Sequence, residues 1–77
     1  MDIHLADVMV HIDEDLDKEH RNEIEVVLRS IEGVVSVSNR DKTPHLSLIE
    51  YNPKKTSSQQ LISCVIGQGV HAELIGL

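Results

Sequence analysis

A run of acidic and histidine residues near the N-terminus carries the most obvious chemistry in the chain. The segment HIDEDLDKEHR, residues 11–21, contains five acidic residues and two histidines. Asp17 and His20 supply a carboxylate and an imidazole, which suit Zn(II), Ni(II), Co(II) or Fe(II) better than Cu(I). Two ligands alone bind weakly, so such a site needs further donors. The plainer interpretation, which the pattern favours, is that Asp17 caps a helix and the other acids form a solvated approach to it.

The sequence does not fit two other kinds of site, an EF-hand calcium loop and an enzyme active site. Asp13, Asp15 and Asp17 alternate as they do at the start of an EF-hand calcium loop. However, Lys18 stands where that loop needs its sharp-turn glycine, and Ile24 stands where it needs a bidentate glutamate. The sequence also shows no nucleophile with a base and an orienting partner, and no glycine-rich phosphate loop. We therefore expect neither an EF-hand nor an enzyme.

Composition and charge restrict the partners and the compartment. With 13 acidic and 7 basic residues, the chain has a net charge of −6, which argues against nucleic acid and anionic membranes because both attract a basic surface. The single cysteine, Cys64, excludes an internal disulfide framework and suits a reducing compartment. Its place in the apolar arc of a helix makes it a small core residue. No apolar run is long enough for a membrane span and no signal sequence is evident, so we expect a cytoplasmic protein.

Hydrophobic periodicity predicts the elements that must position these residues. Apolar residues alternate with period two in some segments and recur every three or four positions in others, as in strands and amphipathic helices. Asp17 and Ser57 are the predicted N-caps, and Gln60 forms a capping box with Ser57. The predicted elements are a strand at 5–12, a helix from Lys18 to a stop at Gly33, a strand at 34–38, a turn at 39–42, a strand at 45–51, a helix from Ser57 to a stop at Gly69, and a strand at 70–75.

This β-α-β-β-α-β order with short loops predicts a ferredoxin-like sandwich. Two right-handed crossovers place both helices on one face of a four-stranded antiparallel sheet, which is an α+β fold. Neither a linker nor a change in composition divides the chain. We therefore expect a single domain over residues 1–77.

The same blocks of sequence resemble the heavy-metal-associated domain of copper chaperones and metal-transporting ATPases. The resemblance covers nearly the whole chain and implies the same ferredoxin-like fold. It includes EGV after the first helix, YNP after the third strand and GQGV before the last strand, all in register. The matching segments are Val10-x-Ile12, IEVVLRSIEGVVSV at 24–37, LIEYNP at 48–53 and LISCVIGQGVHAEL at 61–74.

The resemblance ends at the metal loop. The family carries Gly-Met-x-Cys-x-x-Cys between the first strand and the first helix, and its two thiolates hold a soft ion such as Cu(I). In this chain Glu14 and Asp15 occupy the Gly-Met positions. Asp17 and His20 occupy the two cysteine positions, and Leu16 remains available for the family's buried-methionine role of pinning the loop. The family's Cu(I) binding and thiol-exchange transfer are therefore not expected here.

The expected topology adds donors to Asp17 and His20. The first strand ends, and the third and fourth strands begin, at the same end of the sheet, which brings His11, His45 and His71 near the loop. We expect His11 and His71 to be near neighbours on antiparallel strands. The candidate metal ligands are therefore Asp17, His20, His11 and His71, and the candidate ion is Zn(II), Ni(II) or Co(II) in a metal-homeostasis role.

The sheet face away from the helices is the other candidate surface. Strand alternation places Leu5 and Met9 on that face. The resemblance implies that Leu46 and Leu48 lie there too, so the four residues would form an apolar patch across the two central strands. A solvated antiparallel sheet is normally polar there, so the patch indicates a protein partner or a homodimer. The alternative is a register shifted by one residue, which turns Leu46 and Leu48 toward the helices. A small interaction module is the first functional interpretation, and divalent metal binding is the second.

Overall fold

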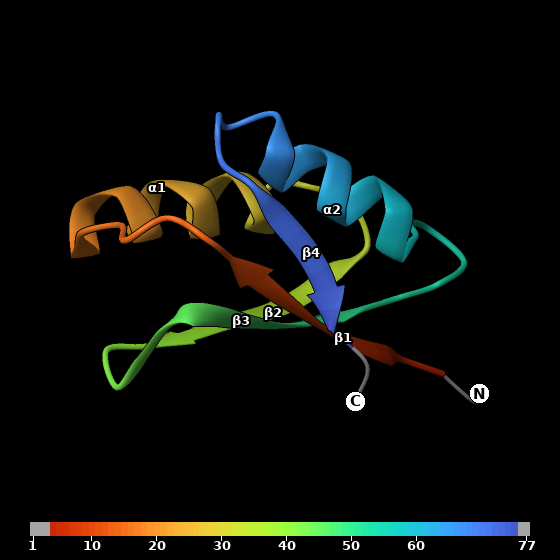
Figure 1. Cartoon of the computed structure of the whole chain (residues 1–77). Helices are drawn as coiled ribbons and strands as arrows, with labels where there is room; N and C mark the ends of the chain where they lie inside the picture. The colour runs from red at the N-terminus through yellow and green to blue at the C-terminus, as the bar shows by residue number, and fades with distance from the viewer. Residues whose placement is uncertain (1–3, 76–77) are drawn as a thin grey trace.

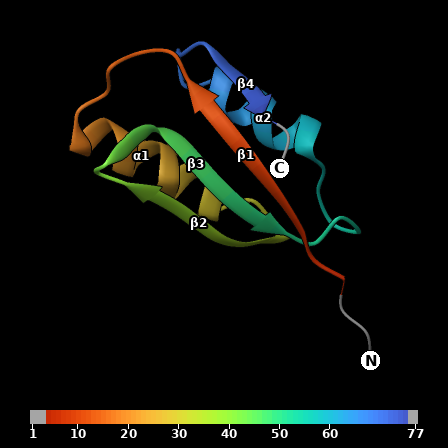
Figure 2. The same cartoon turned by 60° about the horizontal axis from the view of Figure 1, so that its bottom comes forward.

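The computed structural model describes residues 4–75, and its elements follow the order β-α-β-β-α-β (Figure 1). The strands form one antiparallel sheet in the order β2-β3-β1-β4, and both helices cover the same face of it (Figures 1 and 2). This confirms the predicted ferredoxin-like sandwich. The elements are β1 (Ala6–Ile12), α1 (Lys18–Arg29), β2 (Val34–Arg40), β3 (Thr43–Tyr51), α2 (Ser58–Ile66) and β4 (Ala72–Ile75).

Burial along the two central strands, β1 and β3, alternates from residue to residue as predicted. Val10 and Ile49 are fully buried under the helices, whereas Leu46 and Leu48 turn to the opposite face. The alternative register, shifted by one residue, is therefore excluded. The inward residues of these strands are Val8, Val10, Ile12, Ser47, Ile49 and Tyr51, all of them buried.

The helices complete an aliphatic core from the other side. Ile24 and Leu28 of α1 and three residues of α2 are buried against the sheet. Cys64 and Leu16 are partly buried and pack against this core. Leu16 thus anchors the loop between β1 and α1, and Cys64 behaves as the expected small core residue. No helix among residues 4–75 is long and apolar enough to cross a membrane.

Helix α1 starts at Lys18, as predicted, and ends before the predicted stop at Gly33. Asp17 is its N-cap, because the Oδ1 atom of Asp17 accepts a hydrogen bond of 2.8 Å from the backbone N–H of His20. The helix ends at Arg29 with Ser30 as its C-cap. Gly33 follows in a short turn with a φ of +102°, so it serves the entry to β2 and does not terminate the helix directly.

Helix α2 forms only half of the predicted capping box. The Ser57 hydroxyl accepts from the backbone N–H of Gln60 at 3.2 Å, as expected of an N-cap. The side-chain oxygen of Gln60 accepts from the hydroxyl of Thr56 at 3.0 Å instead of turning back to Ser57. The helix ends at Ile66 with Gly67 as its C-cap, and Gly69 lies beyond it with a φ of +92°.

The strand ends also differ from the sequence-based expectation. Strand β2 continues to Arg40, because Asn39 pairs with Ser47 and its side-chain amide donates to the carbonyl of Leu46 at 2.7 Å. The turn expected at 39–42 is therefore shorter. Strand β4 begins at Ala72, two positions later than expected.

Candidate metal centre at the loop between β1 and α1

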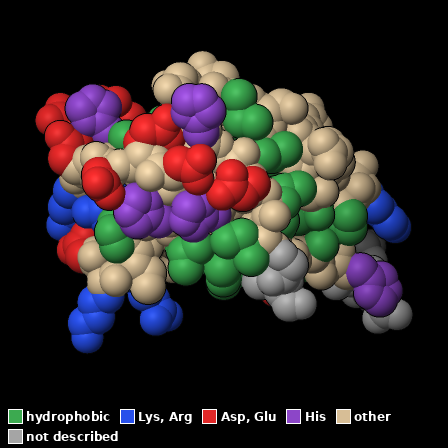
Figure 3. All heavy atoms as spheres, viewed as in Figure 1, with side chains coloured by type: hydrophobic (Ala, Val, Ile, Leu, Met, Phe, Trp, Pro, Cys, Tyr) green, Lys and Arg blue, Asp and Glu red, His purple; other side chains and the backbone are tan. Residues whose placement is uncertain are grey.

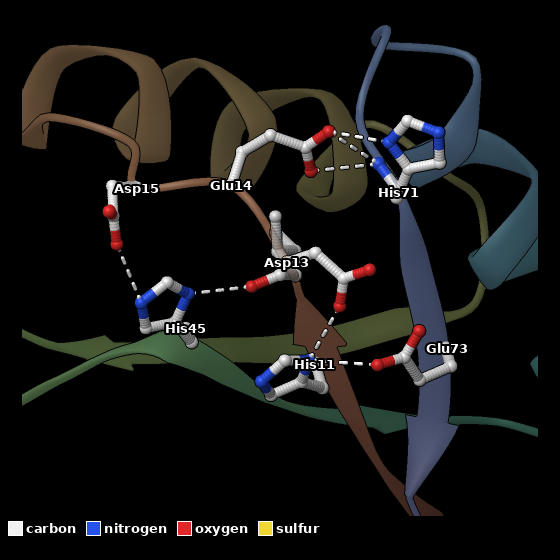
Figure 4. Close-up of polar contacts among 8 residues, drawn as sticks. His11, Asp13, Glu14, Asp15, His45, His71 and Glu73 are labelled. Carbon is white, nitrogen blue, oxygen red and sulfur yellow. Dashed lines mark hydrogen bonds and ion pairs between the residues drawn. The ribbon is translucent and has the colours of Figure 1, made fainter.

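Imidazole and carboxylate side chains gather where β1 ends and β3 and β4 begin. Figure 3 shows this concentration of charged and imidazole groups, with exposed hydrophobic side chains directly beneath it on the side away from the helices. The loop from β1 to α1 carries the acids, and β1, β3 and the turn before β4 supply three of the histidines (Figure 4).

His11, Asp13 and Glu73 form the tightest of these groups. The antiparallel register of β1 and β4 places His11 opposite Glu73. The Nδ1 atom of His11 lies 2.9 Å from Oε1 of Glu73 and 3.2 Å from Oδ1 of Asp13 (Figure 4). Donor atoms of the three residues all lie within 4.8 Å of one another, and the His11 side chain is 34% exposed. One N–H can donate fully to one carboxylate at a time, so two carboxylates compete for one proton.

His45 holds the loop from β3. Its Nδ1 atom lies 2.7 Å from the carbonyl oxygen of Ile12, and its Nε2 atom lies 3.0 Å from Oδ1 of Asp15. The ring stacks on that of His11, with centroids 5.7 Å apart and planes 17° from parallel. Because both ring nitrogens are engaged, His45 positions the loop and supports His11 from the side.

His71, in the turn before β4, contacts the loop between β1 and α1. Its backbone N–H donates to both oxygens of Glu14, at 2.8 and 3.1 Å, and its Nδ1 atom lies 2.7 Å from Oε2 of the same carboxylate. The backbone N–H of Asp13 donates in turn to the carbonyl of His71 at 2.9 Å. The side-chain hydrogen bond to His71 lowers the pKa of Glu14, and the same bond raises the pKa of His71.

Asp17 and His20 pair within the first turn of α1. The Asp17 Oδ1 atom that caps the helix also lies 2.6 Å from Nδ1 of His20. The backbone hydrogen bond from His20, and then its side-chain bond, lower the pKa of Asp17. The side-chain bond to Asp17 raises the pKa of His20. His20, Glu14 and Glu23 help line a pocket of about 240 Å³ between the loop and the turn that precedes β4.

The four ligands proposed from the sequence therefore lie in three separate groups. Asp17 is paired with His20, His71 with Glu14, and His11 with Asp13 and Glu73. His11 and His71 are near each other, but the direct cross-strand neighbour of His11 is Glu73.

Asp13 and Glu73 are the donors that sequence reasoning missed. Pairing Ile12 with Ala72 puts His11 opposite Glu73, so the correct register of β1 and β4 would have found Glu73. Asp13 comes from the loop that follows β1 and is not identified by this register.

The hydrogen bonds also determine which imidazole nitrogens remain for an ion. Nδ1 of His20 and Nδ1 of His71 each lie against a carboxylate, and such a contact orients an imidazole so that its Nε2 atom can bind a metal. In His11, by contrast, Nδ1 itself lies between two carboxylates. A cation at this place would have one nitrogen and two oxygens as its ligands. Imidazole and carboxylate donors suit a borderline divalent ion and not Cu(I).

Comparison with known proteins identifies the fold. No protein-family model matches the chain, and neither does any curated protein sequence. Among solved structures, the N-terminal domain of a potential copper-translocating P-type ATPase from Bacillus subtilis, in its Cu(I)-loaded state, has a TM-score of 0.83 and 27% sequence identity. That alignment covers 92% of this chain and 88% of the other.

Two further neighbours belong to the same structural group. Oxidized MerP from Ralstonia metallidurans CH34 has a TM-score of 0.82 at 17% identity, over 92% of this chain and 97% of that one. The yeast copper transporter domain CCC2A, described in apo and Cu(I)-loaded states, has a TM-score of 0.81 at 16% identity, over 91% and 94% of the two chains. These neighbours confirm the resemblance to heavy-metal-associated domains and the fold that it implied.

Proposed function

Taking the heavy-metal-associated fold as the premise, we propose that this chain is a small non-enzymatic metal-handling module that binds a borderline divalent cation. The ion is Zn(II), Ni(II) or Co(II), and the observation that carries the proposal is the group of His11, Asp13 and Glu73. With one cysteine in the chain, and that one packed against the core, a two-thiolate Cu(I) site cannot be built within it.

The charge and spacing of this group suit a divalent ion. Two carboxylates and a neutral imidazole bring two negative charges, which a divalent cation neutralises. Donors about 2.0–2.2 Å from a tetrahedral Zn(II) lie about 3.3–3.6 Å from one another. The distances from Nδ1 of His11 to Oε1 of Glu73 and to Oδ1 of Asp13 are 2.9 Å and 3.2 Å, so small side-chain rotations would bring these atoms to that spacing. Water would complete the coordination, because His11 is partly exposed.

Titration calorimetry on tag-free protein tests the proposal with each of the three ions. We expect saturable one-to-one binding with a dissociation constant below about 100 μM, or about 5.5 kcal/mol, since a functional site should exceed the affinity of scattered surface histidines. His11→Ala should weaken binding by at least about tenfold, because it removes the only nitrogen of the group, whereas His4→Ala is a matched control at an exposed position outside it. Absence of saturable binding, or equal loss in the two variants, would remove the proposal.

Asp17 and His20 remain the other candidate ligand pair, and the same titration separates them from the His11 group. If the ion binds at His11, then His20→Ala should leave the affinity almost unchanged. Loss of binding in His20→Ala with retention in His11→Ala would move the site to the start of α1. In both cases binding should weaken on acidification, because protons compete with the metal for imidazole nitrogen.

A second function, docking of a protein on the open sheet face, is favoured by a different observation. Leu5, Leu48 and Ile75 are between 37% and 42% exposed, and Met9, Leu46 and Leu48 help line a shallow groove on that face. The net charge of −6 supports a partner other than nucleic acid or an anionic membrane, and the single cysteine supports a reducing compartment such as the cytoplasm.

A further inference from the structure

An apolar row crosses the middle of the open sheet face, which Figure 2 turns toward the viewer. The strand registers place Leu48 of β3 opposite Met9 of β1, and Met9 opposite Ile75 of β4. Their strand neighbours, such as Val10 and Ile49, are buried under the helices, so these three side chains point to the other face. We call Leu48, Met9 and Ile75 the apolar row. Because the open face of an antiparallel sheet is normally polar, the row indicates a contact surface.

Two carboxylates lie along one side of the apolar row. Asp7 of β1 and Glu50 of β3 are direct cross-strand partners, and each is two residues from a member of the row, so they share its face. Like charges directly opposite each other destabilise a sheet. The ion pairs formed among residues 4–75 include neither of these carboxylates. A cation supplied by a partner would therefore relieve their repulsion.

The other side of the apolar row is acidic as well. Glu73 is two residues before Ile75 on β4, so it projects from the same face. Asp13 and Glu73 both contact Nδ1 of His11, which is two residues beyond Met9 on β1. Two carboxylates accompany one imidazole, so this side carries a net negative charge whichever way His11 is protonated.

Basic side chains lie at one corner of the face, where β2 and β3 form a hairpin. Arg40 lines the groove that also contains Leu46 and Leu48, and Lys42 follows in the turn. This corner belongs to β2, whereas Glu73 belongs to β4 at the opposite edge of the sheet. With acids on both sides of the apolar row, a second copy of the chain offers no complementary charge along it. A cationic partner does.

We propose that the open face binds an amphipathic helix of a partner protein, with an aliphatic stripe on the apolar row and lysines or arginines on both sides of that stripe. This inference rests on the second function proposed above, docking of a protein on this face, and names the chemistry of the partner. The net charge of −6 adds long-range attraction for a basic partner.

The spacing of the face suits a helix laid along the apolar row. Leu48 and Ile75 are two strands apart, or about 9.6 Å, and positions i and i+7 of a helix are about 10.5 Å apart. The acids on each side are two residues along a strand from the row, or about 6.8 Å. Lysine and arginine side chains on the flanks of a helix about 10–12 Å wide reach that far. One flank then meets Asp7 and Glu50, and the other meets Glu73.

The size of the face limits the affinity. Four strands about 4.8 Å apart and seven residues long cover about 19 by 23 Å, or about 400 Å². An interface of this size belongs with weak, transient complexes. We therefore expect a dissociation constant of tens to hundreds of micromolar for a single helix.

Fluorescence anisotropy with two labelled synthetic peptides tests the proposal. The first peptide is a helix with leucines at positions i, i+3, i+4 and i+7 and lysines on both sides of them, and the second has the same composition with the leucines scattered around the helix. A chelator in all samples keeps metal out of the measurement. We expect the second peptide to bind at least about tenfold more weakly, because it cannot place leucines and lysines on the face together.

A matched pair of charge variants locates the cationic contact. Combining Asp7→Asn with Glu50→Gln should weaken binding of the first peptide by at least about fivefold. Combining Glu19→Gln with Glu23→Gln changes the net charge equally but on α1, and should leave the affinity within about twofold. Because the first pair of changes removes a like-charge contact, that variant should remain folded, which circular dichroism verifies.

A matched pair of apolar variants locates the stripe. Leu48→Gln should weaken binding by at least about tenfold, because it places an amide in the middle of the apolar row. Leu48 is 39% exposed and Val26 of α1 is 65% exposed, so Val26→Gln is the control and should bind as the wild-type chain does.

The outcomes separate the partner chemistry from docking itself. Equal affinity for the two peptides, or equal loss in the two charge variants, overturns the proposal, because binding would then follow net charge alone. Loss in Leu48→Gln without loss in the Asp7 and Glu50 variant overturns the cationic partner but leaves the face as a docking surface. If neither variant loses affinity, docking on this face is contradicted as well.

Discussion

At the scale of single residues, the acidic loop is a series of carboxylate–imidazole pairs. Each acid between the end of β1 and the start of α1 lies within 3.2 Å of a histidine nitrogen. Among residues 4–75, the ion-pair partners of these acids are therefore imidazoles and not lysine or arginine side chains. The pairs are Asp13 with His11, Glu14 with His71, Asp15 with His45, and Asp17 with His20.

The pair of Asp17 and His20 predicts a specific change in titration. Asp17→Asn should lower the pKa of His20 toward its ordinary value, because the hydrogen bond to the carboxylate raises it in the wild-type chain. Glu14→Gln should do the same for His71. An NMR titration of the ring protons measures both, and each variant is the control for the other. A pKa that falls in both histidines of either single variant would contradict the pairwise assignment.

The same shifts set the pH window in which the cap of α1 is strongest. The pKa of His20 is raised in the folded chain. The stability that His20 contributes to the fold is therefore fully present below its pKa in the unfolded chain, and it is lost as the pH rises through its pKa in the folded chain. The pKa of Asp17 is lowered in the folded chain. The stability that Asp17 contributes is therefore present above its pKa in the unfolded chain, and it is lost as the pH falls through its pKa in the folded chain. The cap is therefore strongest between the unfolded pKa values of the two groups.

At the scale of elements, local patterns predicted most of the fold. Period-two alternation predicted the inward set of β1, and Asp17 and Ser57 marked both helix starts by their capping chemistry. For β3 the inward set followed from the family resemblance, and the structure decided between that register and the one shifted by one residue. The helix ends were less accurate, because a glycine with positive φ, such as Gly33, can follow a helix after a further turn.

The metal group was the harder prediction, because it depends on long-range pairing. Periodicity places Glu73 on a strand and on the outward face, but only the register with β1 brings it to His11. Asp13 joins them because the chain leaves the sheet just after Ile12 and folds back beside His11. A single sequence does not specify either geometry.

The two glycines with positive φ predict unequal effects of alanine. In Gly33→Ala the new methyl group would lie 2.7 Å from Cβ of Lys55 and 3.2 Å from Cγ2 of Thr56, whereas at Gly69 nothing lies within 4 Å. Gly69→Ala should cost about 1–2 kcal/mol of unfolding free energy, the penalty of a left-handed conformation. Gly33→Ala should cost at least about 1 kcal/mol more, because the turn must also shift.

Urea unfolding of both glycine variants measures the difference. A domain of this size has a total stability of about 3–5 kcal/mol, so Gly33→Ala should leave a detectable unfolded fraction even without urea. Equal midpoints for the two variants would show that the chain relieves the contact with Lys55 at no cost.

At the scale of the whole molecule, the scaffold and the ligand chemistry are separable. The backbone matches a Cu(I)-loaded domain with a TM-score of 0.83, yet the loop that connects β1 to α1 carries carboxylates, and these pair with imidazoles of the adjoining elements. Core packing depends on inward residues such as Val10 and Ile49, and none of the proposed metal ligands is among them. The ligand chemistry of the loop can therefore differ without a change of fold.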